Sequence, residues 1–302
     1  MKTLLFATTF IATLLTSPLA GAKPPAKPAT TSAVATTNNR TVSEALIKKQ
    51  IRKAVGEAFA DGIFADPRFV LDKDLYAPAP SKSGERSQPK KRAESNYDYA
   101  ISEEYLEKAR AFLEDKNDVF AQEEKRYAIP KEVIVVLLVV ETRLGEKLGR
   151  RPVITTLYTR AVVRTHRQKP EFAERELIAF LRICEKNDLD PFSIYGSATG
   201  AFGLPQFEPT SYPGLAARYL ADGKPPDLFT ADDAIWSVGN YLHQAGWDRG
   251  KLSREQVLLR YNRQLAYVDV ILDGADILAG RTTPHRHYIP VDPILTERAA
   301  IK

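Results

Sequence analysis

Apolar residues recur at helical spacing along most of the chain, whereas runs typical of β-strands are sparse. Continuous helical patterns cover residues 103–127, 131–148 and 171–187. In the third of these, four apolar residues fall on one side of the predicted helix: Leu177, Phe180, Leu181 and Cys184. The pattern therefore predicts a mainly α-helical protein with little sheet.

Start and stop signals predict three further helices. One begins at Ser43 and has five apolar positions along an amphipathic face: Leu46, Ile51, Val55, Ala58 and Phe59. A second covers residues 230–245, and Gly246 is typical of the stop that follows a helix. The capping box at 253–256 opens the third, which runs to residue 262.

Four segments lack this periodicity and flank or interrupt the predicted helical region, residues 42–281. Residues 1–22 read as a cleaved secretory signal peptide, and no Cys lies near the cleavage point, so we do not expect a lipoprotein. Residues 23–41 are rich in Ala, Pro and Thr and predict a flexible spacer. Residues 80–95 form a polar insert, expected to be a solvated loop, and residues 282–302 form an irregular, Pro-containing C-terminal tail.

Charge and cysteine content narrow the function only slightly. The formal net charge of +5 favours weak attraction to anionic partners but does not distinguish nucleic acid, membrane or cell wall. The single Cys184 cannot form an internal disulfide, and its apolar neighbours predict a core thiol. The four His residues and this Cys show no metal-ligand spacing, so we expect no metal.

Glu141 is the most informative residue, because it ends the apolar run 133–140. A continued helix would put it on the stripe of Ile134, Leu137 and Leu138, with Gly145 one turn further on and open space above the carboxyl. A carboxyl against apolar walls has a raised pKa, which suits a general acid near neutral pH. A helix-end Glu that simply reaches water is the alternative, and the pattern alone leaves both open.

A glycine-rich segment, residues 196–212, supplies candidate binding chemistry. Its glycines permit turns and close approach of a ligand, while Ser, Gln and Tyr offer neutral hydrogen bonds and Phe offers flat apolar surface. This chemistry suits a sugar, although an ordinary tight loop is the alternative. The spacing of phosphate-binding loops is absent.

Together these motifs resemble the B-type lytic murein transglycosylases. The matching motifs are residues 140–145, 196–212 and 261–262, extended by 64–68, 127–132, 233–235, 239–241 and 246–247. The resemblance covers roughly residues 45–280, without the insert. It implies a mainly α (α+β lysozyme-like) catalytic domain with a substrate groove. It also implies non-hydrolytic cleavage of the β-1,4 bond between N-acetylmuramic acid and N-acetylglucosamine, giving 1,6-anhydromuramyl products.

The resemblance also implies roles for six residues. Glu141 matches the family's sole general acid and base. Five others fall on positions that line the glycan groove: Ser197, Gln206, Tyr241, Tyr261 and Asn262. Each has a structural alternative, because the two tyrosines could be core aromatics with satisfied hydroxyls, and Ser197 and Asn262 could be turn or cap residues.

The expected partner is the peptidoglycan glycan strand, met in the periplasm or after secretion by a monomer that needs no cofactor, nucleic acid or transmembrane anchor. A hydrolytic muramidase and a non-catalytic peptidoglycan-binding protein are the alternatives. The second is disfavoured, because an idle relative has no reason to keep Glu141 in an apolar setting.

Two features bear on mechanism. No Asp or Glu occurs between Glu146 and Glu171, so a partner carboxylate just after the catalytic helix is missing, though one could arrive from elsewhere in the fold. The same stretch carries seven cations that could meet substrate carboxylates or simply be solvated: Lys147, Arg150, Arg151, Arg160, Arg164, Arg167 and Lys169. Residues 219–228 lack the alternating oxygen ligands of the calcium loop that such proteins often carry, so we predict no calcium.

Overall fold

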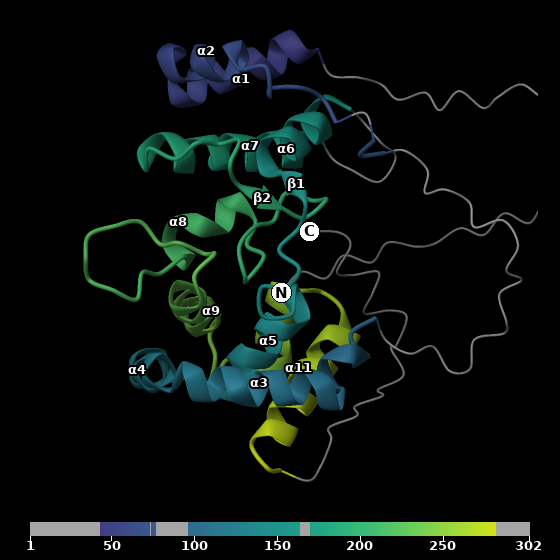
Figure 1. Cartoon of the computed structure of the whole chain (residues 1–302), viewed down its shortest axis with the longest axis vertical. Helices are drawn as coiled ribbons and strands as arrows, with labels where there is room; N and C mark the ends of the chain where they lie inside the picture. Colours follow the sequence, from purple (N-terminus) through teal and green to yellow (C-terminus); the bar gives the residue numbers. More distant parts are fainter. Residues whose placement is uncertain (1–42, 73, 77–95, 164–169, 282–302) are drawn as a thin grey trace, which may run out of the picture. The chain divides into compact units, whose positions relative to one another are not determined.

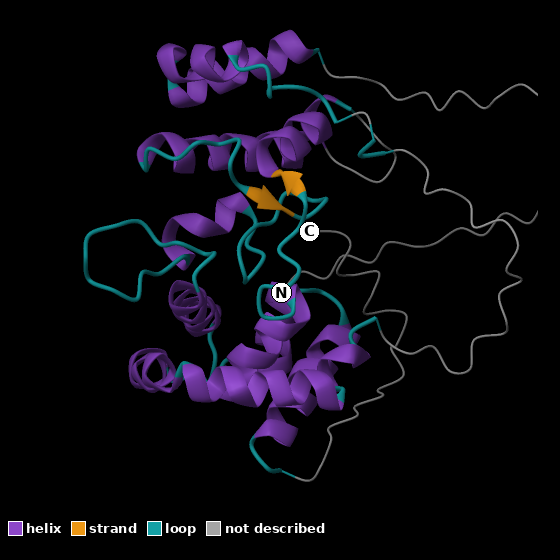
Figure 2. Cartoon of the chain, viewed as in Figure 1, coloured by secondary structure: helices purple, strands orange, loops and turns teal. Residues whose placement is uncertain are grey.

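The structure is a computed structural model that describes residues 43–72, 74–76, 96–163 and 170–281 (Figure 1). The predicted signal peptide, spacer, polar insert and C-terminal tail lie outside the described residues. Within those residues, helices dominate and the sheet is a single pair of two-residue strands (Figure 2). The mainly α-helical fold class predicted from the sequence is confirmed.

The elements follow one another in the order α1 (Glu44–Val55), α2 (Glu57–Ala65), η1 (Asp98–Ile101), α3 (Glu103–Asp115), α4 (Asn117–Tyr127), α5 (Lys131–Thr142), β1 (Arg151–Pro152), α6 (Val153–Val162), α7 (Pro170–Lys186), β2 (Tyr195–Gly196), η2 (Pro209–Ser211), α8 (Tyr212–Leu215), α9 (Ala231–Ala245), α10 (Arg254–Tyr261) and α11 (Leu265–Leu278). The strands β1 and β2 are antiparallel, with Arg151 opposite Gly196 and Pro152 opposite Tyr195. This pairing ties the start of α6 to the glycine-rich segment.

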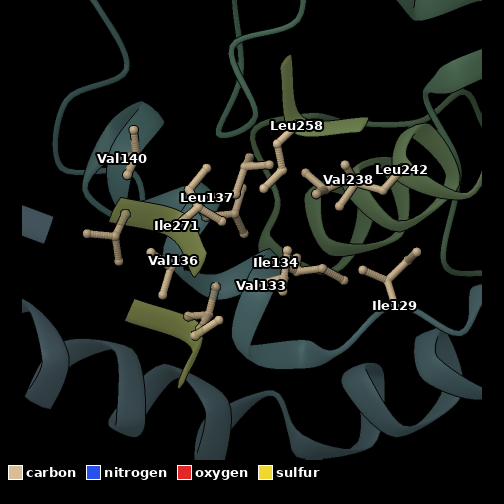
Figure 3. Packing of buried hydrophobic residues seen from close by; sticks show 14 of the residues in the cluster. Ile129, Val133, Ile134, Val136, Leu137, Val140, Val238, Leu242, Leu258 and Ile271 are labelled. Carbon is tan, nitrogen blue, oxygen red and sulfur yellow. The ribbon is translucent and has the colours of Figure 1, made fainter. Parts of the chain in front are cut away.

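The α5 helix is the centre of one hydrophobic core. Every residue from Val133 to Val140 is at most 6% exposed, because α3, α9 and α11 all pack against this helix. Figure 3 shows residues of α5 facing Ile271 from α11, Leu258 from α10 and Val238 from α9. A helix that is apolar on all sides is stable only when it is enclosed in this way. The enclosure leaves the end of α5 as the place where a polar side chain can emerge.

A second core joins α1, α6 and α7. The four residues predicted to share one side of the 171–187 helix are all fully buried in it. Burial raises the pKa of the Cys184 thiol to about 12. The prediction that Cys184 is a core thiol is therefore confirmed.

Three of the predicted helices are shorter in the structure than the hydrophobic pattern suggests. The 131–148 pattern ends as a helix at Thr142, because Arg143, Leu144 and Gly145 have φ angles of 54°, 57° and 96°, in the left-handed region. Gly145 therefore does not continue the stripe above Glu141, and a Cβ there would lie 3.8 Å from Cγ of Leu204. The expected open space above the carboxyl does not arise from this glycine.

The other two predicted helices are each divided in two. Lys116 separates α3 from α4, and Gly56, with a φ of 82°, separates α1 from α2.

The apolar face predicted for the helix that begins at Ser43 is wrong at Leu46, which is 47% exposed, whereas its neighbour Ile47 is buried. The capping box is confirmed, since Ser253 Oγ accepts from the Gln256 amide and Gln256 Oε1 accepts from the Ser253 amide. Thr230 occupies the N-cap of α9 without a side-chain capping bond.

Candidate active site

One cleft of about 700 Å³ is lined by all six residues singled out in the sequence. Glu141 comes from the last turn of α5, Ser197 and Gln206 from the glycine-rich segment, Tyr241 from α9, Tyr261 from the end of α10, and Asn262 follows it. Other lining residues include Phe172, Phe207, Glu208, Arg260 and Arg263. A second hollow of about 470 Å³ along α7 contains none of the six. The first cleft is therefore the candidate active site.

Glu141 is half-buried in this cleft and accepts a 2.7 Å hydrogen bond at Oε1 from the hydroxyl of Tyr267, a fully buried residue of α11. Burial raises the pKa of Glu141 to about 7, although the hydrogen bond from Tyr267 lowers it. The neighbouring Arg143 does not pair with the carboxyl and lies over the rings of Tyr99 and Tyr105. At neutral pH Glu141 is therefore present in both protonated and ionised forms.

Three tyrosines form an aromatic wall beside the carboxyl. The ring of Tyr261 stacks on that of Tyr267 with centroids 6.3 Å apart, and the ring of Tyr241 lies 4.7 Å from that of Tyr261. The hydroxyl of Tyr241 donates to the Arg260 carbonyl at 2.8 Å, and that of Tyr261 donates to the Pro205 carbonyl at 2.5 Å. Both hydroxyls are thus satisfied by the backbone, as the structural alternative anticipated, while the side chains still line the cleft.

The polar cleft residues also make local hydrogen bonds. Ser197 Oγ accepts from the amides of Thr199 and Ala201, so it shapes the turn it belongs to. Gln206 Nε2 donates to the Gly203 carbonyl at 2.9 Å and to the Leu148 carbonyl at 3.3 Å. These bonds fix the two side chains before any ligand binds and leave Gln206 Oε1 as an acceptor.

The glycines of this segment serve packing within the protein rather than close approach of a ligand. A Cβ on Gly203, whose φ is 75°, would lie 2.4 Å from Cβ of Leu228. A Cβ on Gly196 would lie 2.2 Å from the Ala201 carbonyl oxygen. The sequence interpretation of glycine as space for a sugar is therefore corrected at these positions.

Tyr267 is a site residue that is not among those predicted from the sequence, where the last predicted helix ends at residue 262. The apolar pattern of α11 could have revealed that helix, with Tyr267, Val268 and Ile271 all buried. Nothing in the pattern marks the Tyr267 hydroxyl as the partner of a carboxyl 126 residues earlier. That contact follows from the packing of α11 against α5.

Glu208 is a second carboxyl in the same cleft, supplied by the glycine-rich segment and not by the stretch after α5. The pKa of Glu208 is raised by burial and by Glu176, against the lowering effect of Arg175 and Arg160. The cleft thus holds two carboxyls, Glu141 and Glu208.

The cations of residues 147–169 do not line the cleft wherever the structure describes them. Arg160 instead donates to the Ala198 carbonyl at 3.2 Å and supports the Ser197 turn from behind. Arg164, Arg167 and Lys169 lie outside the described residues. The cations that do line the cleft, Arg260 and Arg263, flank the Tyr261–Asn262 pair.

The 219–228 region is organised by Asp233, a buried carboxylate. Asp233 accepts from the Arg218 guanidinium at 2.7 Å and from the amides of Tyr219 and Asp227 at 2.9 and 2.7 Å.

Across the described residues, no three His, Cys, Asp or Glu side chains gather as metal ligands would. Nor does any described helix combine the length and apolar character that crossing a bilayer requires.

Comparison with known sequences matches this chain to one protein family and to one relative within the lytic transglycosylases. The family model described as Transglycosylase SLT domain matches residues 35–276. Membrane-bound lytic murein transglycosylase B of Escherichia coli (strain K12) is 35% identical over 138 residues, which are 46% of this chain and 36% of that protein. The aligned part is therefore little more than a third of the length of this relative.

Comparison with solved structures gives the fold. Soluble lytic transglycosylase SltB1 from Pseudomonas aeruginosa matches with a TM-score of 0.67 and 23% identity, over 78% of this chain and 98% of that one. SltB3 from the same organism, in complex with NAG-anhNAM-pentapeptide, matches with a TM-score of 0.65 and 21% identity, over 79% of each chain. At these identities the likeness establishes a shared fold, and it agrees with the lysozyme-like class expected from the sequence.

Proposed function

This chain belongs to the Transglycosylase SLT domain family, and on that premise we propose that it is a peptidoglycan lytic transglycosylase. The bond cleaved is the β-1,4 linkage between N-acetylmuramic acid and the next N-acetylglucosamine, and the product carries a 1,6-anhydromuramyl end. The observation that carries the proposal is Glu141, a carboxyl with a pKa of about 7 that opens into a cleft lined by tyrosine, serine and amide side chains.

In the first step, the protonated Glu141 donates its proton to the glycosidic oxygen as the bond from that oxygen to C1 of the muramyl residue breaks. The leaving N-acetylglucosamine then carries the new hydroxyl. Tyr267 holds Oε1, whereas Oε2 accepts no hydrogen bond from the described residues and is the oxygen left for the substrate. This division orients the carboxyl toward the cleft.

In the second step, the ionised Glu141 takes the proton of the muramyl C6 hydroxyl while that oxygen bonds to C1 and closes the anhydro ring. The carboxyl returns to its protonated form, so the cycle consumes neither water nor a second acidic group. A pKa near 7 serves both steps, because the group must give and regain one proton at the same pH.

The aromatic wall and the fixed amide groups position the sugar for these steps. Tyr241 and Tyr261 present ring surface rather than hydroxyls, since both hydroxyls are held by carbonyls. Gln206 Oε1 and Asn262 are the polar groups assigned to the muramyl residue. Preformed hydrogen bonds reduce the entropy lost when the glycan strand binds.

The experiment that tests this function incubates the purified protein with isolated peptidoglycan and identifies the released fragments by mass spectrometry. We expect anhydromuropeptides from the wild type and at least about 10²-fold slower release by Glu141→Gln, the lower end for a positioned acid–base group. Glu146→Gln, which removes a neighbouring exposed carboxylate, is the matched control and should retain activity. Equal rates for wild type and Glu141→Gln would contradict the assignment.

A hydrolytic muramidase is the second candidate, and the presence of Glu208 in the cleft is the observation that favours it. A hydrolase would use this carboxyl to activate water and would release fragments with reducing ends. The match to the Transglycosylase SLT domain family favours the transglycosylase. If the wild type and Glu208→Gln both release fragments with anhydro ends, the hydrolase is excluded.

The substrate also bears on where the protein works. Peptidoglycan lies outside the cytoplasm, so we propose that the protein is exported by its predicted signal peptide and acts in the periplasm or after secretion. Cell fractionation with antibody detection would check this, and a solely cytoplasmic mature protein would contradict it.

A further inference from the structure

Thr142 follows Glu141 in the chain but is fully buried, and its side chain does not line the cleft. Its hydroxyl lies 3.0 Å from the Leu204 carbonyl oxygen and 3.4 Å from that of Leu138, so Leu204 is the nearer acceptor. The same hydroxyl accepts from the Gly145 amide at 3.2 Å. Thr142 therefore joins the end of α5 both to the loop that follows this helix and to the glycine-rich segment.

Residues 204–206 of the glycine-rich segment are anchored one after another to different parts of the protein around the cleft. After the bond to α5 at residue 204, the Pro205 carbonyl accepts from the hydroxyl of Tyr261 at the end of α10. The Gln206 side chain then donates to the Leu148 carbonyl at 3.3 Å, in the loop after α5. Three successive residues are thus held at three separate places.

Gln206 has a backbone conformation that depends on such anchors. Its φ of 50° lies in the left-handed region, which residues other than glycine seldom adopt and keep only where surrounding contacts impose it. Its side chain lines the same cleft as Glu141. Of the three anchors, the bond from Thr142 is the one that begins on α5, directly after Glu141. This bond therefore links the backbone that carries the carboxyl to the backbone that carries the Gln206 amide.

We propose that Thr142 is a positioning residue, which sets the place of the Gln206 amide relative to the Glu141 carboxyl. It touches neither the substrate nor the reacting atoms, and it acts through the Leu204 carbonyl. The inference rests on the proposed function, because it concerns how the muramyl residue assigned to Gln206 is presented to the acid and base.

The test measures kcat for fragment release from isolated peptidoglycan by the wild type, Thr142→Val and Thr142→Ser. Valine has nearly the shape of threonine without the hydroxyl, whereas serine keeps the hydroxyl and loses only a methyl group. Because a misplacement of about 1 Å can slow a reaction about 10²-fold, we expect Thr142→Val to lower kcat about tenfold. Thr142→Ser should keep most of the wild-type kcat, and a loss as large as that of Thr142→Val would overturn the role of the hydroxyl.

Thr159→Val is the matched control for the loss of a buried hydroxyl. Thr159 is 1% exposed and lies outside the residues that line the cleft. Its hydroxyl donates to the Thr155 carbonyl at 2.7 Å and accepts from the Asp72 amide at 2.8 Å, the same two kinds of bond as at Thr142. We expect Thr159→Val to lower Tm as Thr142→Val does but to keep the wild-type kcat. Equal losses of kcat in the two variants would overturn the positioning role.

A double-mutant cycle shows whether Thr142 acts through Gln206. Gln206→Gly removes the amide, and glycine adopts a φ of 50° without strain. We expect Thr142→Val to cause no further loss of kcat in the Gln206→Gly background, because the group that it positions is already absent. The same fold-loss in both backgrounds would overturn the inference.

The pH–rate profile separates this role from an effect on the acid itself. The Thr142 hydroxyl bonds to the backbone and not to the Glu141 carboxyl, so the alkaline limb of the profile should stay in place in Thr142→Val. A shifted limb would overturn the action through Gln206. A wild type that releases no fragments would overturn the proposed function, whereas an active wild type matched by Thr142→Val would overturn the positioning role alone.

Discussion

The hydroxyl of Tyr267 donates a 2.7 Å hydrogen bond to Oε1 of Glu141, joining two helices whose residues are 126 positions apart. This bond opposes the effect of burial on the Glu141 pKa. It also fixes one oxygen of the carboxyl and leaves the other toward the cleft. Tyr267 thus acts as a positioning residue for the proposed acid and base.

Tyr267→Phe should therefore raise the pKa of Glu141 above its present value of about 7. Because the proposed first step needs the protonated carboxyl, activity falls as pH rises through this pKa, and the variant should keep its activity to higher pH. We also expect a loss of about tenfold in kcat/KM at neutral pH, because the carboxyl is less well oriented. The pH–rate profile measures both effects.

Tyr105→Phe provides the control for that variant. The Tyr105 hydroxyl donates to Glu146 at 3.3 Å, outside the set of residues that line the cleft, so its removal should leave the alkaline limb of the profile in place. A Tyr267→Phe profile that superimposes on the wild type would contradict the positioning role.

Glu123→Gln should stabilise the protein at alkaline pH. Glu123 is fully buried between α4 and α9, neither of its carboxylate oxygens has a hydrogen-bond partner among the described residues, and burial raises its pKa from 4.5 to about 8. As pH rises from 4.5 to 8, the unfolded chain loses this proton before the folded protein does, so the free energy of unfolding falls. Because glutamine does not titrate, the variant does not show this fall in the free energy of unfolding.

The expected gain for Glu123→Gln is roughly 2–4 kcal/mol at pH 9 and near zero at pH 4, measured by denaturant unfolding at both values. Glu114→Gln, an exposed carboxylate of α3, should show no such pH dependence. If the two variants had the same unfolding curves at pH 9, Glu123 would have to be ionised at little cost in the folded protein.

Gly203→Ala should destabilise the glycine-rich segment. The residue has a φ of 75°, and its new Cβ would lie 2.4 Å from Cβ of Leu228. We expect a cost of about 1–3 kcal/mol beyond backbone strain, visible as a lower Tm.

Gly223→Ala isolates the strain, because Gly223 has a φ of 74° and nothing within 4 Å of a Cβ. The difference between the two variants is the packing effect. Equal Tm values would show that Leu228 moves away at no cost.

The hydrophobic pattern predicted structural features correctly where they depend on a single helix. The apolar run 133–140 predicted a buried helix ending in a partly buried carboxyl, and the 171–187 pattern predicted the face that carries Cys184. These features depend on side-chain periodicity along one element, which the sequence states directly. The capping box at Ser253 is of the same kind, since its partners are three residues apart.

The pattern failed where backbone conformation, rather than hydrophobicity, set the boundary. Residues 143–145 take up left-handed φ angles and end α5, although the apolar spacing continues toward Leu148. Leu46 and Ile47 are equally apolar, and the direction from which α6 and α7 cover α1 decides which of them is buried. Hydropathy carries neither piece of information.

The sequence by itself determined the helical class, the apolar setting of Glu141 and the six residues that meet in the cleft, because periodicity and a family resemblance are properties of the chain. Only the tertiary structure decided that Tyr267 holds Glu141, that the hydroxyls of Tyr241 and Tyr261 are taken by carbonyls, and that Glu208 enters the same cleft. The physical reason is that a hydrogen bond depends on where two helices cross and which atoms then face each other. Residue type and spacing along the chain do not specify that crossing.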